Sequence, residues 1–165
     1  MRHITIIKIS ALALTVVTAA ASAQTVHTEK NMSLELANQI ATASVAACAV
    51  NGYAVAATVV DRAGTVRAVQ RADNARPHTL GASQAKAFTS ASAKNTTLAM
   101  MEGAQKTPVA ANLVYIPGYL LLGGGVPVKV GNDVIGAVSV GGAPGGNLNE
   151  QCAMAALDKV KDQLK

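Results

Sequence analysis

The segment from Gly123 to Val160 constrains the fold more than any other part of this 165-residue chain. Two apolar runs, VPVKV and VIGAVSV, flank the dipeptide Asn132-Asp133, a pattern typical of a tight β-hairpin. The glycine-rich loop GGAPGGN follows the second run and leads into an Ala-containing helical segment. Asn147, with Glu150 three residues later, predicts a capping box at the start of that helix.

The upstream half shows helical periodicity after Ser33 and two short apolar runs beyond Gly52. We expect further elements in chain order: a helix after Ser33, strands at 53–60 and 65–71 joined by a turn at 61–64, a long helix at 77–95, a shorter helical piece at 96–104, and an irregular, mobile loop at 106–118. Strands and helices in this order predict an α+β fold, an antiparallel sheet flanked by helices.

The order of LGGGVPV, the hairpin, VIGAVSVGG and the final helix resembles the GlcG/HbpS family, haem-binding proteins to which haem degradation has also been ascribed. The upstream block from AACAVNGY to KAFTSAS resembles the first half of the same family, so the resemblance covers the chain from about Leu34 onward. It implies a profilin-like version of the α+β fold, a haem cofactor and assembly into homo-oligomers. The small side chains of the core favour oligomerisation as well.

The first 23 residues have the pattern of a secretory signal peptide. A short basic opening precedes an apolar run that is too short to span a bilayer comfortably, and Ala21-Ser22-Ala23 is a small-residue cleavage site. We expect cleavage near Ala23, a mature single domain at residues 24–165 without a membrane span, and a periplasmic or secreted location. A retained membrane anchor is the alternative.

The charge of the chain argues against binding to nucleic acid. Removal of Arg2 and Lys8 with the signal leaves 12 basic and 9 acidic residues, a net charge of only +3. The chain has no Lys/Arg run and only four aromatic residues, whereas nucleic-acid binding needs a basic face and, for single strands, stacking platforms. The partner that we expect is a small molecule.

Cys48 and Cys152 are the only cysteines, and each falls on an expected helix. In an oxidising compartment such a pair predicts a disulfide, provided that the two helices are neighbours. Two buried free thiols are the alternative.

Three kinds of functional site are excluded because the sequence lacks their motifs: a structural zinc site, a nucleophilic serine and a dinucleotide-binding loop. No Cys/His cluster has the spacing of zinc ligands, and the VSVGG context of Ser139 lacks the strand-to-helix elbow of a nucleophilic serine. GGAPGG departs from the dinucleotide-binding fingerprint and follows an antiparallel hairpin. Whether the protein is an enzyme stays open at this point.

The loop GGAPGGN is a candidate anion site, because its glycines let backbone N–H groups approach a ligand at the positive end of a helix. Gly142, Gly145, Gly146 and Asn147 would hold a carboxylate, a haem propionate or a phosphate. A plain strand-to-helix connection is the alternative interpretation of the same residues.

His78 is the first candidate ligand for haem iron, because Pro77 places it at a fixed turn before a helix. His27 is the second candidate, since relatives carry a haem-linked histidine near the N-terminal helix. Lys86 is a position of the family motif and a candidate partner for an anionic ligand. A surface histidine and an ordinary ion-pair lysine are the alternatives.

Two functions remain. The resemblance implies an exported haem-binding protein that scavenges, senses or degrades haem. The glycolate-linked branch of the family implies instead the binding or turnover of a small hydroxy or keto carboxylate. A structural oligomer without a ligand is a third possibility.

Overall fold

One antiparallel sheet organises residues 26–165, the part of the chain that the computed structural model describes. The predicted signal peptide lies outside these residues. The strand order is β2-β1-β4-β3, and every neighbouring pair is antiparallel. The strands are β1 (Ala56–Asp61), β2 (Val66–Arg71), β3 (Gly125–Val130) and β4 (Asp133–Gly141).

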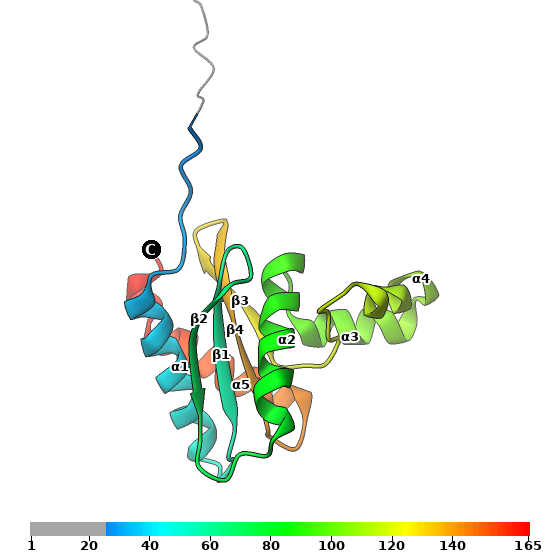
Figure 1. Cartoon of the computed structure of the whole chain (residues 1–165), viewed down its shortest axis with the longest axis horizontal. Coiled ribbons are helices and arrows are strands. Elements are labelled where there is room, and N and C mark those ends of the chain that lie inside the picture. Colours follow the sequence, from blue (N-terminus) through cyan, green and yellow to red (C-terminus); the bar gives the residue numbers. More distant parts are fainter. Residues whose placement is uncertain (1–25) are drawn as a thin grey trace, which may run out of the picture.

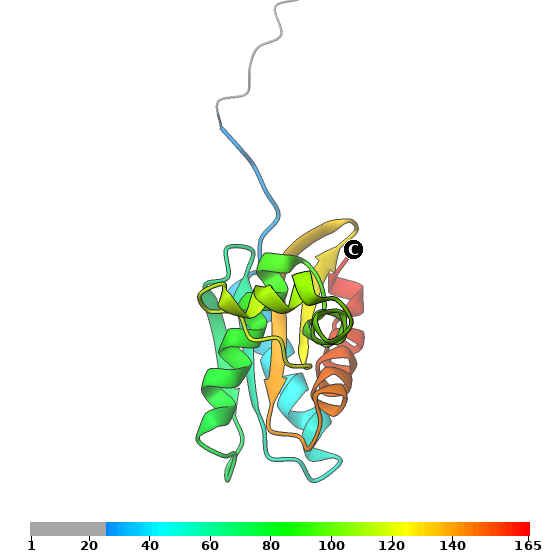
Figure 2. The same ribbon diagram turned by 90° about the vertical axis from the view of Figure 1, so that its right-hand side faces the viewer.

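Helices cover both faces of this sheet (Figures 1 and 2). Helices α1 (Leu34–Ala49) and α5 (Gly146–Lys159) pack side by side on one face, and α2 (His78–Ala93) covers the other. The α+β fold with an antiparallel sheet flanked by helices, predicted from the order of elements, is therefore confirmed.

A projecting arm follows α2 in the chain and extends away from the sheet (Figure 1). It consists of α3 (Thr97–Lys106), α4 (Pro108–Ala111) and the 3₁₀ helix η1 (Asn112–Tyr115). The expected irregular loop at 106–118 is thus wrong in part, because a short α-helix and a 3₁₀ turn form within it. Pro108 occupies the first turn of α4, where its missing N–H costs nothing. A second 3₁₀ helix, η2 (Lys161–Gln163), follows α5.

The main hydrophobic core lies between the sheet and the α1–α5 layer. Ile40 and Ala37 of α1 and Ala153 of α5 are fully buried against Val59 and Val138 of the two central strands. These strands are buried on both faces, which explains why they are continuous apolar runs rather than alternating ones.

The contact between α2 and the sheet is narrower and more polar. Ala87 and Ala91 pack against Val60 and Ala137, while the buried hydroxyl groups of Thr58 and Ser83 share a hydrogen bond of 2.8 Å. Small and hydroxyl-bearing side chains let α2 approach the strands closely and leave room for one long buried side chain, described below.

The start of the first helix agrees with its prediction, and that of the last does not. The Ser33 hydroxyl accepts a hydrogen bond from the Leu36 N–H, as expected for an N-cap. Helix α5 begins at Gly146 after an N-cap Gly145 that has no side chain to cap with. Asn147 therefore lies inside the first turn with its side chain exposed, and the predicted capping box is wrong.

The predicted disulfide is confirmed. Cys48, near the end of α1, is bonded to Cys152 in α5, with 5.3 Å between their Cα atoms. The bond joins two helices that already pack against each other on one sheet face. Within residues 26–165, no helix is long and apolar enough to cross a membrane.

Candidate functional site

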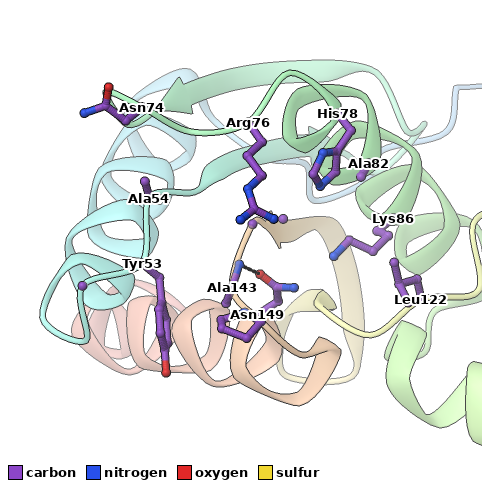
Figure 3. A pocket seen from close by; sticks show the side chains of 14 residues that line it. Tyr53, Ala54, Asn74, Arg76, His78, Ala82, Lys86, Leu122, Ala143 and Asn149 are labelled. Carbon is purple, nitrogen blue, oxygen red and sulfur yellow. Dashed lines mark hydrogen bonds between the residues drawn. The ribbon is translucent and has the colours of Figure 1, made fainter.

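A cavity of about 500 Å³ (Figure 3) opens at one end of the sheet, and the two hairpin turns lie together at the opposite end (Figure 1). Its walls come from the α1–β1, β2–α2 and β4–α5 connections and from the first turns of α2. The pairing of Ala56 with both Arg71 and Gly141 brings these three connections to one end of the sheet. Figure 3 labels polar side chains that line the cavity, among them Tyr53, Arg76, His78, Lys86 and Asn149.

Lys86 forms the inner wall of the cavity. It projects from α2 toward the cavity (Figure 3), yet only 1% of its surface is exposed to solvent. Its Nζ donates hydrogen bonds to the backbone carbonyl oxygens of Gly123, at 2.9 Å, and Val140, at 2.5 Å. Burial disfavours the charged amine and lowers the pKa of Lys86 to about 8, and the negative charge of Glu150 opposes this shift.

The glycine run before β3 makes room for this lysine. Gly124 has φ +127°, and a Cβ atom built on it would lie 2.6 Å from Lys86 Nζ. The same Cβ would lie 2.6 Å from the carbonyl oxygen of Val140. Glycine is therefore required here both by the backbone angle and by the space that the amine occupies.

Arg76 and His78 enter the cavity from the β2–α2 connection, and Figure 3 shows them directed toward the space they share with Lys86. The buried Thr79 fixes this turn, because its hydroxyl donates a 2.7 Å hydrogen bond to the Arg76 carbonyl. Arg71 adds a hydrogen bond to the carbonyl of Ala75. Two exposed polar side chains are thus held on a short, well-tethered segment.

The opposite wall is the β4–α5 connection. Its conformation is held by Asn149, whose Oδ1 accepts a hydrogen bond from the Ala143 N–H at 3.1 Å. Gly142 lines the cavity with φ +131°, and a Cβ there would lie 2.8 Å from the Ala54 carbonyl oxygen. The β4–α5 and α1–β1 connections therefore run so close together that a side chain at position 142 would clash.

The structure separates the expected site residues into three groups. His78, Lys86 and Gly142 share the cavity wall. The other residues expected from the glycine-rich loop, Gly145, Gly146 and Asn147, follow it toward α5 and do not line the cavity. Gly146 instead packs on the backbone of Gly123, whose Cα lies 2.9 Å from the point where a Cβ atom on Gly146 would stand.

His27 lies at the other end of the sheet, beside the hairpin turns. Its Nε2 is 3.6 Å from the Glu29 carboxylate, and Arg62 and Asp133 line the same shallow surface depression. The structure therefore does not bring the two expected histidines together.

The cavity wall is suited to an anion. Arg76, Lys86 and His78 are its ionisable nitrogen groups, and the described lining residues include no aspartate or glutamate. Apolar contact comes from small residues and from Leu122 and Tyr53. No group of three or more His, Cys, Asp or Glu side chains within residues 26–165 is placed to hold a metal ion.

Tyr53 and Asn149 were not anticipated as site residues. Tyr53 lies at an expected strand start, and Asn149 lies in an expected helix, so neither position stands out in the sequence. Arg76 carried a local signal, its place two residues before His78, but the fold alone shows that it faces Lys86.

Comparison with known proteins links this architecture to one family. The family model described as haem degrading protein HbpS-like matches residues 32–158. The crystal structure of a double mutant of HbpS from Streptomyces reticuli is 34% identical, with a TM-score of 0.77, over 88% of this chain and 98% of that one.

Two more distant structures share the fold. Protein ORFY of Klebsiella pneumoniae is 28% identical, with a TM-score of 0.76, over 84% of this chain and 96% of that chain. A PduOC–haem complex, at 19% identity and a TM-score of 0.70 over 78% of this chain and 94% of that one, resembles it in fold. No curated protein matches the sequence.

Proposed function

The chain belongs to the HbpS-like family of haem-degrading proteins, and we propose that it is an exported haem-binding protein whose ligand enters the cavity walled by Arg76, His78 and Lys86. The observation that carries this proposal is the convergence of an imidazole and two basic side chains on one open cavity. The family and the haem complex of a similarly folded protein support haem as the ligand class.

The residues of the cavity fit a haem group. Histidine is a common axial ligand of haem iron, and the imidazole of His78 is exposed in the cavity. The Arg76 guanidinium could bind a propionate carboxylate. Small apolar residues such as Ala54, Ala82 and Pro144 offer flat contact for a ring edge. When bound, haem would supply its redox chemistry, while the protein would orient it and neutralise its propionates.

Export is the second part of the proposal. We propose cleavage near Ala23, a mature domain at residues 24–165 and a periplasmic or secreted location. The Cys48–Cys152 disulfide supports this location, because such bonds persist in oxidising compartments. Mass spectrometry of the exported protein should give an N-terminus at Gln24, and an intact Met1 would contradict cleavage.

A titration of the mature protein with haemin tests the binding proposal. Specific binding predicts a Soret shift that saturates at a fixed stoichiometry, with Cys48 and Cys152 still bonded. A shift that grows without saturation, as for haemin adsorbed on protein surfaces, would overturn it.

A small hydroxy or keto carboxylate is the second candidate ligand. No aspartate or glutamate is among the described lining residues, which favours this candidate, because an anion beside Arg76 and Lys86 then meets no carboxylate on the cavity wall. Calorimetry with glycolate and with glyoxylate tests this candidate. Heat that saturates and is lost in Arg76→Gln would support it, and no heat in the wild type would exclude it.

We further propose a homo-oligomer in which the projecting arm contacts a second copy. Val109, Val114 and Tyr115 expose 80%, 52% and 81% of their surface on α4 and η1, an unusual concentration of exposed apolar groups on one segment. Light scattering of the mature protein would test this, and a monomeric mass would contradict it.

A further inference from the structure

Lys86 is held in a way that an ion-pair lysine is not. Two backbone carbonyl oxygens accept hydrogen bonds from its amine, and no carboxylate lies among the hydrogen-bond or salt-bridge partners of its Nζ in the described structure. A neutral amine has two N–H bonds and one lone pair. When the carbonyls of Gly123 and Val140 accept the two N–H bonds, the lone pair takes the remaining direction.

Lys86 lines the cavity, and Figure 3 shows its side chain directed into that space, so the lone pair is the part of this amine that a ligand in the cavity would meet. We propose that Lys86 is a nucleophile that forms a reversible imine with the carbonyl carbon of a small aldehyde or 2-keto carboxylate. The proposal rests on the second candidate function above, the binding of a small carboxylate in this cavity, and is independent of haem.

The reaction balances without a further reagent. The Nζ lone pair forms a bond to the carbonyl carbon while the C=O π pair moves to oxygen, which gives a carbinolamine. The two amine protons then leave with that oxygen as one water molecule, and a C=N double bond forms. The cavity is open to solvent, so water molecules can carry the protons, and the water molecule that is released can leave into the solvent. No oxidation or reduction occurs.

The hydrogen-bond partners suit the product as well as the amine. Protonation of the imine nitrogen by solvent gives one N–H, from which the carbonyl oxygen of either Gly123 or Val140 can accept a hydrogen bond. Arg76 is the group that would hold the carboxylate of the ligand, since its guanidinium lines the same wall and can bind a carboxylate through two hydrogen bonds. An aldehyde that lacks a carboxylate should therefore react more slowly than one that has it.

The chemistry also requires a neutral amine at neutral pH. Burial lowers the pKa of Lys86 to about 8. The fraction of neutral amine at a given pH rises about tenfold for each unit by which a pKa falls. Lys86 should thus compete well against the exposed lysines, which outnumber it.

Reductive trapping tests the proposal. Mature protein is incubated at pH 7 with glyoxylate and cyanoborohydride, which converts an imine into a stable carboxymethyl-lysine, and peptides are mapped by mass spectrometry. We expect Lys86 to be modified at least about tenfold faster than Lys94 or Lys165, with a rate that saturates in glyoxylate and falls when glycolate is added. Acetaldehyde, which has no carboxylate, should show less preference for Lys86.

Equal or faster labelling of the exposed lysines, or an unlabelled Lys86 at saturating glyoxylate, would overturn the proposal. Lys86→Met should lose the rapid site, and the wild-type peptide map decides the matter even if that variant fails to fold. Arg76→Gln should lower the preference for glyoxylate over acetaldehyde. If calorimetry shows glycolate binding while Lys86 stays unlabelled, carboxylate binding holds and the nucleophile fails; if glycolate does not bind either, both fail.

Discussion

The Nζ atom of Lys86 lies 2.6 Å from the point where a Cβ atom on Gly124 would stand, although 38 positions separate the two residues in the chain. A long cationic side chain of α2 thus occupies the space that a glycine leaves at the entrance to β3. The inner wall of the cavity depends on this pair.

Gly124→Ala should destabilise the protein by about 2–4 kcal/mol, because a positive φ and a clash with both an amine and a backbone oxygen combine. Gly103→Ala is the matched control: Gly103 lies inside α3, has open space around it, and should gain up to about 1 kcal/mol from better helix propensity. Urea unfolding of the two variants measures both values, and equal midpoints would contradict the packing described for Gly124.

The stability of the protein should rise with pH between about 8 and 10.5 through Lys86. Its folded-state pKa is lowered, so in this window the unfolded chain binds more protons than the folded one, and removing protons favours folding. Below pH 8 both states are protonated and the cost of the buried charge is fully present. Above 10.5 both are neutral and the contribution is constant.

Unfolding free energies at several pH values, for wild type and Lys86→Met, isolate this contribution from those of other groups. Arg76 and His78 across the cavity remain in both proteins, so their own contributions cancel in the difference. Glu150 on α5 is electrostatically coupled to Lys86, so its contribution differs between the two proteins, and the comparison is made above pH 8, in the window where Lys86 itself titrates. Parallel curves for the two proteins between about pH 8 and 10.5 would show that the pKa of Lys86 is the same in the folded and unfolded states, and would contradict this prediction.

His78→Ala should weaken haemin binding at least about tenfold, a loss of about 1.4 kcal/mol, and shift the Soret band, because it removes the proposed iron ligand. His27→Ala should do little, since His27 lies at the other end of the sheet. Both side chains are exposed, so stability should change by no more than about 0.5 kcal/mol in either variant. A spectral change in His27→Ala alone would indicate that the haem site lies in the N-terminal segment and would contradict this prediction.

Reduction of the Cys48–Cys152 bond should lower the free energy of unfolding by about 3–5 kcal/mol, because the bond closes a loop of 104 residues in the unfolded chain. Unfolding with and without dithiothreitol measures the difference, and Cys48→Ala/Cys152→Ala serves as a permanently open control. Thiol titration of unfolded, unreduced protein should find no free cysteine. Two free thiols would contradict the bond.

Replacing Val109 and Tyr115 on the arm by serine should reduce self-association by at least about tenfold, since both side chains are largely exposed in the single chain. Light scattering over a range of concentrations measures the effect. Serine replacements at Leu34 and Val50, exposed apolar residues at the two ends of α1, provide a control that should leave the assembly unchanged. If both pairs of serine replacements reduced self-association equally, the arm would not be the specific interface.

Local sequence patterns sufficed for the secondary structure wherever one residue type determines the backbone. Ser33 caps α1, and Gly52 and Gly64 adopt the positive φ angles that end a helix and close a turn. The hairpin forms as expected, but its two-residue turn is Gly131-Asn132, one position earlier than the predicted Asn132-Asp133, because Asp133 already pairs with Val130 as the first residue of β4. The pattern failed at Asn147, because two glycines before it let the helix start earlier than its side chain suggested.

The cavity was only partly predictable, since it depends on how three distant connections meet. His78 and Lys86 stood out as an unusual histidine and a motif lysine, but nothing local distinguishes Tyr53 or Asn149. The burial of Lys86 depends on α2 lying across the sheet against the glycine run of β3, a long-range contact that periodicity does not report.

The hairpin turns and the cavity lie at opposite ends of the sheet, and this separation has an evolutionary consequence. Both hairpin turns, which set the strand register, lie at one end, whereas the connections that wall the cavity lie at the other. Substitutions or insertions in those connections can therefore change which molecule fits without shifting a single strand pair. Related proteins with this fold can thus differ in the ligand they bind while the residues that set the strand register stay the same.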